Sequence, residues 1–302
     1  MNIQQTLTPV ELDRIAERND LHATWLFVCN YGIIAGIFAV MAVWPNPLTI
    51  VLGTLLLGGR QLGLFVLVHE CGHGTLFGSK RMNELAGDWL GAAPTFDDMR
   101  HYSRGHLQHH RLAGTTEDPD LPNYRDYPIS RERLRRKIFR DLTGQTGWKQ
   151  TKGLFKALMT FNEQPLERRL ALARGLLFNA LMLGLFVYLG VAWLYLVWWA
   201  ALLTSYRLAS RLRQVAEHGN VPDLYDRDPR LHTRTVAVPW YDRLLFCPLG
   251  VSYHVEHHMM ASIPLYNLPK LHKVLKDKGH YDDVVFLPNY ANMLRHVTAM
   301  PA

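Results

Sequence analysis

The sequence is poor in cysteine: its 302 residues include three, which lie far apart at Cys29, Cys71 and Cys247. This number and spacing exclude a disulfide framework and a zinc module built on cysteine pairs. Internal repeats, low-complexity tracts and charge-rich segments without apolar residues are also missing, so we expect an ordered chain. The sequence also lacks the alternation of aromatic and basic residues that would predict nucleic-acid binding. The features that stand out are long apolar segments and 15 histidines.

Charged residues are almost absent from two long segments near the start of the chain. Residues 24–44 contain none, and residues 48–68 contain Arg60 alone. As a helix, each segment is long enough to cross the roughly 30 Å hydrocarbon core of a bilayer. Pro45 and Pro47 lie between the two segments and suit a tight turn. We therefore predict two transmembrane helices joined by a short connection.

A third apolar block extends over residues 175–206. It is too long for one membrane span and short for two. We interpret it as a hairpin of helices at about 173–189 and 191–210, which turns near Gly190. Together with the first pair, this hairpin gives four predicted transmembrane helices.

The positions of the basic residues predict the orientation. With four spans, residues 1–23, 69–174 and 207–302 lie on one side, and the segments 69–172 and 211–302 are expected to form the cap. Every lysine and arginine except Arg60 falls on that side, so we expect it to be cytoplasmic. Two buried hairpins in a soluble protein would leave this one-sided charge unexplained. The polar N-terminus lacks a small-residue cleavage site, and no signal peptide is predicted. The expected fold is an all-α membrane protein, one domain over residues 1–302, with a cytoplasmic helical cap.

Two shorter helices are predicted outside the spans. Thr8 and Glu11 match a capping box with proline at the first helical position, which indicates a helix start. Residues 131–142 are basic and carry apolar side chains four residues apart. Such a helix suits an anionic cytoplasmic leaflet, and it equally suits packing on the domain.

Histidines gather in three short clusters. The first has the pattern HxxxH and directly follows the second span, and the other two both have the pattern HxxHH. Residues three and four apart share one helix face, so each cluster directs two or three imidazoles the same way. Neutral imidazole binds zinc, copper, iron and nickel, and eight imidazoles are more than one metal can use. The clusters are His69 and His73; His106, His109 and His110; and His254, His257 and His258.

The predicted topology brings all three clusters to the cytoplasmic membrane surface. His218, just beyond the fourth span, is a ninth candidate ligand. Gln214 lies one helical turn earlier and is a candidate to hold a metal-bound water. The other histidines are interpreted as structural or surface residues: His22, His101, His232, His272, His280 and His296.

The order of the three clusters resembles the membrane fatty acid desaturase family. HxxxH, HxxHH and HxxHH follow one another, and the long gap contains the transmembrane hairpin. The segment 117–120 after the second box, Tyr253 before the third box and the segment 263–268 after it are also similar. The first box departs from the commoner pattern in having Glu70 and three intervening residues, which the family allows. The resemblance extends from the first span to about Leu271.

This resemblance implies a centre of two iron ions, held by the eight box histidines and His218, with O₂ as co-substrate. Side chains alone cannot attack unactivated methylene C–H bonds, so such chemistry belongs to a redox metal. The implied activity is that of a fatty acid desaturase, which uses O₂ and two electrons to introduce a double bond into a lipid acyl chain. Lipid hydroxylases and carotenoid ketolases share the superfamily, and ligand identity does not separate these reactions.

Carboxylates near the boxes are candidates to orient the histidines, because metal-bound imidazoles usually donate their second N–H to a carboxylate or carbonyl. Each could equally be a helix cap or a solvated charge. An arginine inside a membrane is costly, so Arg60 is a candidate for a substrate tunnel or for a bundle ion pair. The carboxylates are Glu70, Asp97, Asp98, Glu117, Asp118, Asp120, Glu217 and Glu256.

Two other functions explain less of the sequence. His69, Glu70 and His73 match the H-E-x-x-H pattern of zinc metalloproteases, but that chemistry needs three protein ligands and leaves both HxxHH boxes unexplained. A lipid-binding protein that kept the fold would have no need of an intact ligand set.

The expected partners follow from what the resemblance requires. The chain has no haem-binding His-Pro-Gly-Gly motif, cysteine cluster or glycine-rich dinucleotide fingerprint. We therefore expect a separate electron donor such as a ferredoxin, rubredoxin or cytochrome. The resemblance further implies an acyl or lipid substrate. We expect the protein to lie in a bacterial inner membrane. An acidic carrier would suit the basic cytoplasmic face.

Overall fold

The computed structural model describes residues 6–299. This part of the chain consists of helices and turns, and its isolated β contact is a bridge between Val236 and Leu287. The all-helical fold is confirmed. The α-helices are α1 (Pro9–Ala16), α2 (Asp20–Val43), α3 (Pro47–His73), α4 (Lys80–Leu85), α5 (Met99–Leu112), α6 (Arg131–Leu142), α7 (Gln145–Met159), α8 (Leu166–Tyr188), α9 (Trp193–Leu203), α10 (Ser205–His218), α11 (Pro229–His232), α12 (Trp240–Leu245), α13 (His254–Met259), α14 (Leu268–Asp277) and α15 (Tyr290–His296).

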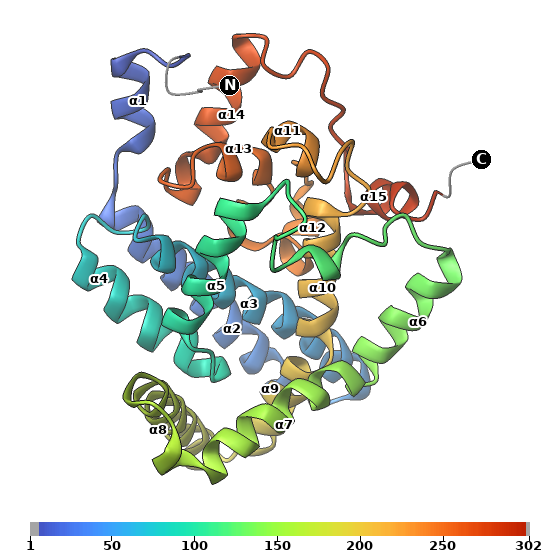
Figure 1. The fold of residues 1–302 in the computed structure, drawn as a ribbon. Helices are drawn as coiled ribbons and strands as arrows, with labels where there is room; N and C mark the ends of the chain where they lie inside the picture. Colours follow the sequence, from blue (N-terminus) through green and yellow to red (C-terminus); the bar gives the residue numbers. More distant parts are fainter. Residues whose placement is uncertain (1–5, 300–302) are drawn as a thin grey trace.

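Three helices of the described chain, α2, α3 and α8, are long and apolar enough to cross a membrane. They differ in their surroundings. In its most apolar window, 61% of α3 is buried within the protein, against 33% for α2 and 28% for α8. In Figure 1, α3 accordingly lies in the middle of the molecule with other helices around it. Most residues in the apolar windows of α2 and α8 are therefore not buried within the protein.

The first three predicted spans correspond to these helices. Residues 24–44 fall on α2, residues 48–68 on α3 and residues 173–189 on α8. The side chain of Asn46 accepts hydrogen bonds from the first turn of α3. Gly190 stands between α8 and α9 with a φ of 74°, in the left-handed region that glycine adopts without strain.

Residues 191–210, predicted as one helix, form two. Helix α9 contains 11 residues, which is too short to cross a bilayer alone. Thr204 has non-helical backbone angles, φ −118° and ψ −85°, and separates α9 from α10. Directly after it, the Ser205 hydroxyl donates to the carbonyl of Thr54 on α3 at 2.6 Å. The chain therefore breaks its helix where it contacts α3.

Glycines allow neighbouring elements to approach α3 closely. A Cβ atom on Gly58 would lie 2.3 Å from Ser205 Oγ, and one on Gly59 would lie 2.4 Å from the carbonyl oxygen of Leu244. Both distances are far below van der Waals contact. Any larger residue at these positions would push α10 or α12 away, so α3 is fixed against both.

Beside the apolar helices α2, α3, α8 and α9 lies a region that we call the cap. It comprises α1, α5, α6 and α10–α15. Buried apolar side chains from distant parts of the sequence form its core, among them Ile15, Leu212, Val255 and Leu271. Two sequence predictions are confirmed within it. Helix α6 covers residues 131–142, and the capping box at Thr8 starts α1. Figure 1 shows α6 and α7 following one another along one edge and leading the chain back to α8.

Candidate metal centre

The first histidine pair stands on the last turns of α3. His69 and His73 are four residues apart and share a face of the helix. Gly74 follows with a φ of 70° and ends the helix with a left-handed cap. Because α3 is fixed by its packing, both imidazoles project from a rigid element.

The other boxes also lie on helices, as their spacing requires. The Asp98 side chain caps α5 by accepting from the backbone N–H of His101, and the last turns of α5 carry the second box. The short helix α13 carries the third box, and His218 is the last residue of α10.

These four elements bring the nine predicted histidines together in two groups. Within each group, one nitrogen of every histidine lies within 4.8 Å of the others. His110 and His258, one from each group, have ring centroids 4.4 Å apart, so the groups adjoin. The five-histidine group is His69, His73, His106, His110 and His257. The four-histidine group is His109, His218, His254 and His258.

Hydrogen bonds set the orientation of three of these rings. Nδ1 of His69 lies 2.8 Å from Glu70 Oε1, and Nδ1 of His109 lies 2.8 Å from Asp118 Oδ1. Nδ1 of His218 donates to the carbonyl of His232 at 3.2 Å. Since Nδ1 carries the proton in each case, Nε2 presents its lone pair to the interior.

The remaining nitrogens test whether the site fits a metal. Burial lowers the pKa of His106, His257 and His258 well below the usual histidine value, so these rings are neutral. Among the described residues, both ring nitrogens of His257 are buried without a hydrogen-bond partner, and so is Nε2 of His69 and of His73. Buried polar atoms normally have partners. A set of neutral imidazoles with unpaired nitrogens facing one another fits metal ions of the type that imidazole binds.

A fatty acid desaturase family model matches residues 42–289. The chain belongs to the fatty acid desaturase family. It is similar to a β-carotene ketolase of Paracoccus sp., with 28% identity over 83% of this chain and 93% of that one. It is also similar to the dihydrorhizobitoxine desaturase of Bradyrhizobium elkanii, with 24% identity over 83% and 74%. An sn-1 oleoyl-lipid 12-desaturase of Picosynechococcus sp. is 22% identical over 88% and 80%.

Three predicted carboxylates contact histidines of this desaturase-family site. Besides Glu70 and Asp118, Glu217 lies 3.6 Å from Nδ1 of His254 and accepts from Arg213 Nε at 2.7 Å. Glu70 also accepts from the backbone N–H of Leu265 at 3.1 Å, so it links the end of α3 to the segment after the third box.

Glu256 has a different set of partners. This fully buried carboxylate accepts from the hydroxyls of Thr235 and Tyr281, both at 2.6 Å, and contacts His272 Nδ1 at 2.5 Å. The contacts hold α13 against α14 and the loop after it. His272 was predicted to be structural, and Thr235 and Tyr281 carry no sequence signal because they lie outside the boxes. Tyr124 was missed in the same way: it stacks on His218 and donates to Asp118.

The other candidate carboxylates have their main contacts outside the histidine groups, although an Asp120 carboxylate oxygen lies 4.0 Å from Nδ1 of His109. Asp97 accepts from Thr95 at 2.7 Å, Asp98 pairs with Arg168 at 3.5 Å, and Glu117 is exposed. Asp120 is half-buried and donates its backbone N–H to Asp118.

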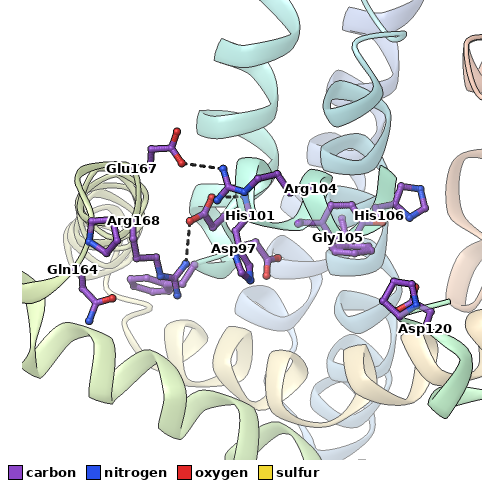
Figure 2. A pocket seen from close by; sticks show the side chains of 15 residues that line it. Asp97, His101, Arg104, Gly105, His106, Asp120, Gln164, Glu167 and Arg168 are labelled. Carbon is purple, nitrogen blue, oxygen red and sulfur yellow. Dashed lines mark hydrogen bonds and ion pairs between the residues drawn. The ribbon is translucent and has the colours of Figure 1, made fainter. Parts of the chain in front are cut away.

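Two cavities meet at the centre. The inner one, of about 310 Å³, is lined by Gln214, Glu217 and histidines of both groups, so Gln214 is close enough to the centre for its predicted role to stay open. The outer one, of about 720 Å³, shares Phe65, Asp97, Tyr102, His106 and Asp120 with it. Figure 2 shows the outer cavity extending from His106 towards the start of α8. There Arg104 pairs with Glu167 at 3.0 Å, joining α5 to α8.

Arg60 is buried with α12 as its partner. Its Nη2 donates to the carbonyls of Arg243 and Leu244 at 2.8 and 2.9 Å. These contacts tie the middle of α3 to α12, and its predicted role at a substrate tunnel stays a prediction.

Proposed function

We propose that this protein is an O₂-dependent oxidoreductase of membrane lipids that binds two iron ions and introduces a double bond into an acyl chain. The observation that carries the proposal is the pair of adjoining groups of buried and half-buried histidines in a chain of this family. The five-histidine group would hold one iron and the four-histidine group the other. The iron pair would supply the one-electron and O₂ chemistry that C–H oxidation requires.

The chain's own residues have distinct tasks in this reaction. Glu70, Asp118 and the His232 carbonyl fix the tautomers of His69, His109 and His218, so each ring turns a lone pair to the metal. The joined cavities bring the substrate to His106. Phe65 and Phe96 supply apolar wall along this route and suit a hydrocarbon chain.

The proposed membrane arrangement has four crossings with both termini and the cap in the cytoplasm of a bacterial inner membrane. Helices α2, α3 and α8 supply three of the crossings. Helix α9 and the start of α10 together supply the fourth, with the break at Thr204 held against α3 inside the bundle. Non-helical backbone is tolerated at such depth where it is buried in protein. The one-sided basic residues support this orientation.

Electrons are proposed to come from a separate carrier of the ferredoxin, rubredoxin or cytochrome type. One relative is named an sn-1 acyl-lipid omega-3 desaturase (ferredoxin), with 28% identity over 35% of this chain. The basic face of the cap suits an acidic carrier.

Ketolation or hydroxylation of a lipid is the second candidate reaction. The observation that favours it is the match to the β-carotene ketolase, which covers 93% of that protein. The metalloprotease alternative is disfavoured because Glu70 is buried, is bonded to His69 and Leu265, and belongs to a chain of the desaturase family.

Metal analysis of the purified protein and lipid analysis of expressing cells test the proposal together. We expect two irons per chain and a lipid that has lost two hydrogens. A lipid that gains oxygen with the same iron content would establish the second candidate. One zinc per chain and unchanged lipids, after exclusion of zinc uptake during overexpression, would contradict both.

Variants separate the centre from general effects on folding. His73→Ala and His258→Ala each remove one ligand, one per group. His22→Ala is the matched control, because His22 is exposed and stacks on Tyr266 away from the centre. We expect lipid oxidation to be lost in the first two and retained in the control.

A further inference from the structure

One further histidine, outside the nine of the two groups, shares features with them. His232 is the last residue of the short helix α11, and its side chain is 4% exposed. Its ring centroid lies 5.5 Å from that of His258, at an interplanar angle of 77°. Within the four-histidine group, His258 lies at similar separations of 5.0 Å from His109 and 5.2 Å from His218.

The hydrogen bonds of His232 determine which nitrogen is available. Nδ1 lies 2.8 Å from the carbonyl oxygen of Asp226, so Nδ1 carries the proton and donates it. Nε2 therefore keeps its lone pair. Among the described residues this buried atom has no hydrogen-bond partner, the same condition as Nε2 of His69 and His73. A proton on one nitrogen held by a carbonyl, with the other nitrogen unpaired, is the usual arrangement of a metal-site histidine.

The backbone of His232 also forms a hydrogen bond with a member of the same group. Its carbonyl accepts from Nδ1 of His218. Helix α11 is capped by Asp228, and Thr233 Oγ donates to the carbonyl of Pro229 at 2.6 Å. These local bonds fix the position of the ring independently of the metal, so Nε2 is held near the group.

We propose that His232 is a tenth histidine of the centre and that its Nε2 accepts a hydrogen bond from a water on the metal of the four-histidine group. This inference rests on the proposed iron site. His232 is outside the set whose nitrogens lie within 4.8 Å of one another, which leaves room for a water between Nε2 and the metal. An unprotonated Nε2 is an acceptor, and a metal-bound water is a strong donor. With this water, the protein would hold five groups around the metal of the four-histidine group, the same number as around the metal of the five-histidine group.

Gln214 offers a competing way to hold such a water. It lines the inner cavity together with His109, His218 and His254, whereas the described contact of His232 is with His258. The two residues therefore act at different positions, and their variants give different predictions.

The test compares iron binding by purified full-length variants loaded anaerobically with Fe²⁺ alone. For His232→Ala we expect about 10- to 100-fold weaker binding of one of the two irons, the effect usual for loss of a group that supports a metal site. With ⁵⁷Fe, Mössbauer spectra should show one of two iron signals changed and the other retained. His232→Gln keeps an acceptor and should recover most of the binding.

His296→Ala is the matched control. His296 Nε2 bonds to the carbonyl of Asn220, so its loss disturbs the same loop without removing a group near the metal. The assignment of His232 is overturned if His296→Ala weakens iron binding as much as His232→Ala does. It is also overturned if Gln214→Ala changes the iron signal while His232→Ala leaves it unchanged. The same holds if His232→Ala binds two irons with unchanged affinity and spectra.

Wild-type protein distinguishes this inference from the proposed function. Failure of the wild-type chain to bind iron would refute the iron site itself. Two irons in the wild type with an unaffected His232→Ala variant would refute the tenth histidine alone. Melting temperatures of the metal-free variants show whether a substitution acts on folding, and His232→Gln provides the comparison if His232→Ala is poorly folded.

Discussion

The two histidine groups are positioned by different means. The five-histidine group relies on long helices: His69 and His73 project from α3, and His106 and His110 from α5. The four-histidine group takes His109 from α5, His218 from the last residue of α10 and two histidines from the six-residue α13. Its rings are oriented by Asp118, Glu217 and the carbonyl of His232. Packing of α3 and α5 therefore places four of the five histidines in one group, whereas the other group takes one histidine from α5 and has two of its rings held by Asp118 and the His232 carbonyl.

Removal of one histidine from either group should have the largest effect. The loss of activity should be equally complete for the two groups. The proposed lipid oxidation needs both metals, so His110→Ala and His254→Ala are each expected to abolish turnover. The measurement is product formation in lipid extracts together with iron per chain. Near-normal activity with iron retained in His110→Ala would contradict the shared centre.

Metal removal should affect the two groups to different extents. A ligand that binds the folded state alone stabilises it by about 2.7 kcal/mol at a concentration 100 times its Kd. We expect apo-protein to melt at lower temperature, with amide exchange rising more in α13 and residues 219–239 than at the end of α3. The check is hydrogen exchange of the iron-loaded and chelated forms. Equal loss of protection in both regions would mean that α3 also depends on the metal.

The carboxylates that orient the rings should give intermediate effects. Asp118→Asn removes the charged partner of His109, and loss of such partners costs about 10- to 100-fold in metal affinity. Glu70→Gln should cost less, because α3 still holds His69. Iron titrations of both variants test this order. A larger loss for Glu70→Gln would show that packing of α3 is insufficient to place the ring.

The ion pair beside the outer cavity should give the smallest effect. Arg104 and Glu167 are both exposed, and such pairs contribute about 0–1 kcal/mol. Glu167→Gln is expected to change the melting temperature little and iron content not at all. A marked loss of iron would mean that this contact controls the position of α5.

The sequence was most informative where spacing has a direct geometric meaning. Apolar length predicted α2, α3 and α8. The four-residue spacing predicted that the pairs His106 and His110, and His254 and His258, each stay in one group, but His109 and His257 of the same boxes belong to the opposite groups. The break at Thr204 was hidden because it results from the contact between Ser205 and α3, which apolar length does not record. The partners of Glu256 were hidden for a similar reason: Thr235, His272 and Tyr281 are brought to it only by the tertiary fold.

The close packing of α3 on its glycines gives the histidines a distant point of support. Gly58 lies 11 residues before His69, or about 16 Å along the helix axis. Because a Cβ on Gly58 would meet the backbone of Ser205 at 2.5 Å, even alanine there must shift α3 against α10. A helix moves as a rod over this length, so the shift would carry His69 and His73 away from the seven histidines opposite them. A residue deep in the apolar part of the protein thus helps to set the positions of the two histidines at the end of α3.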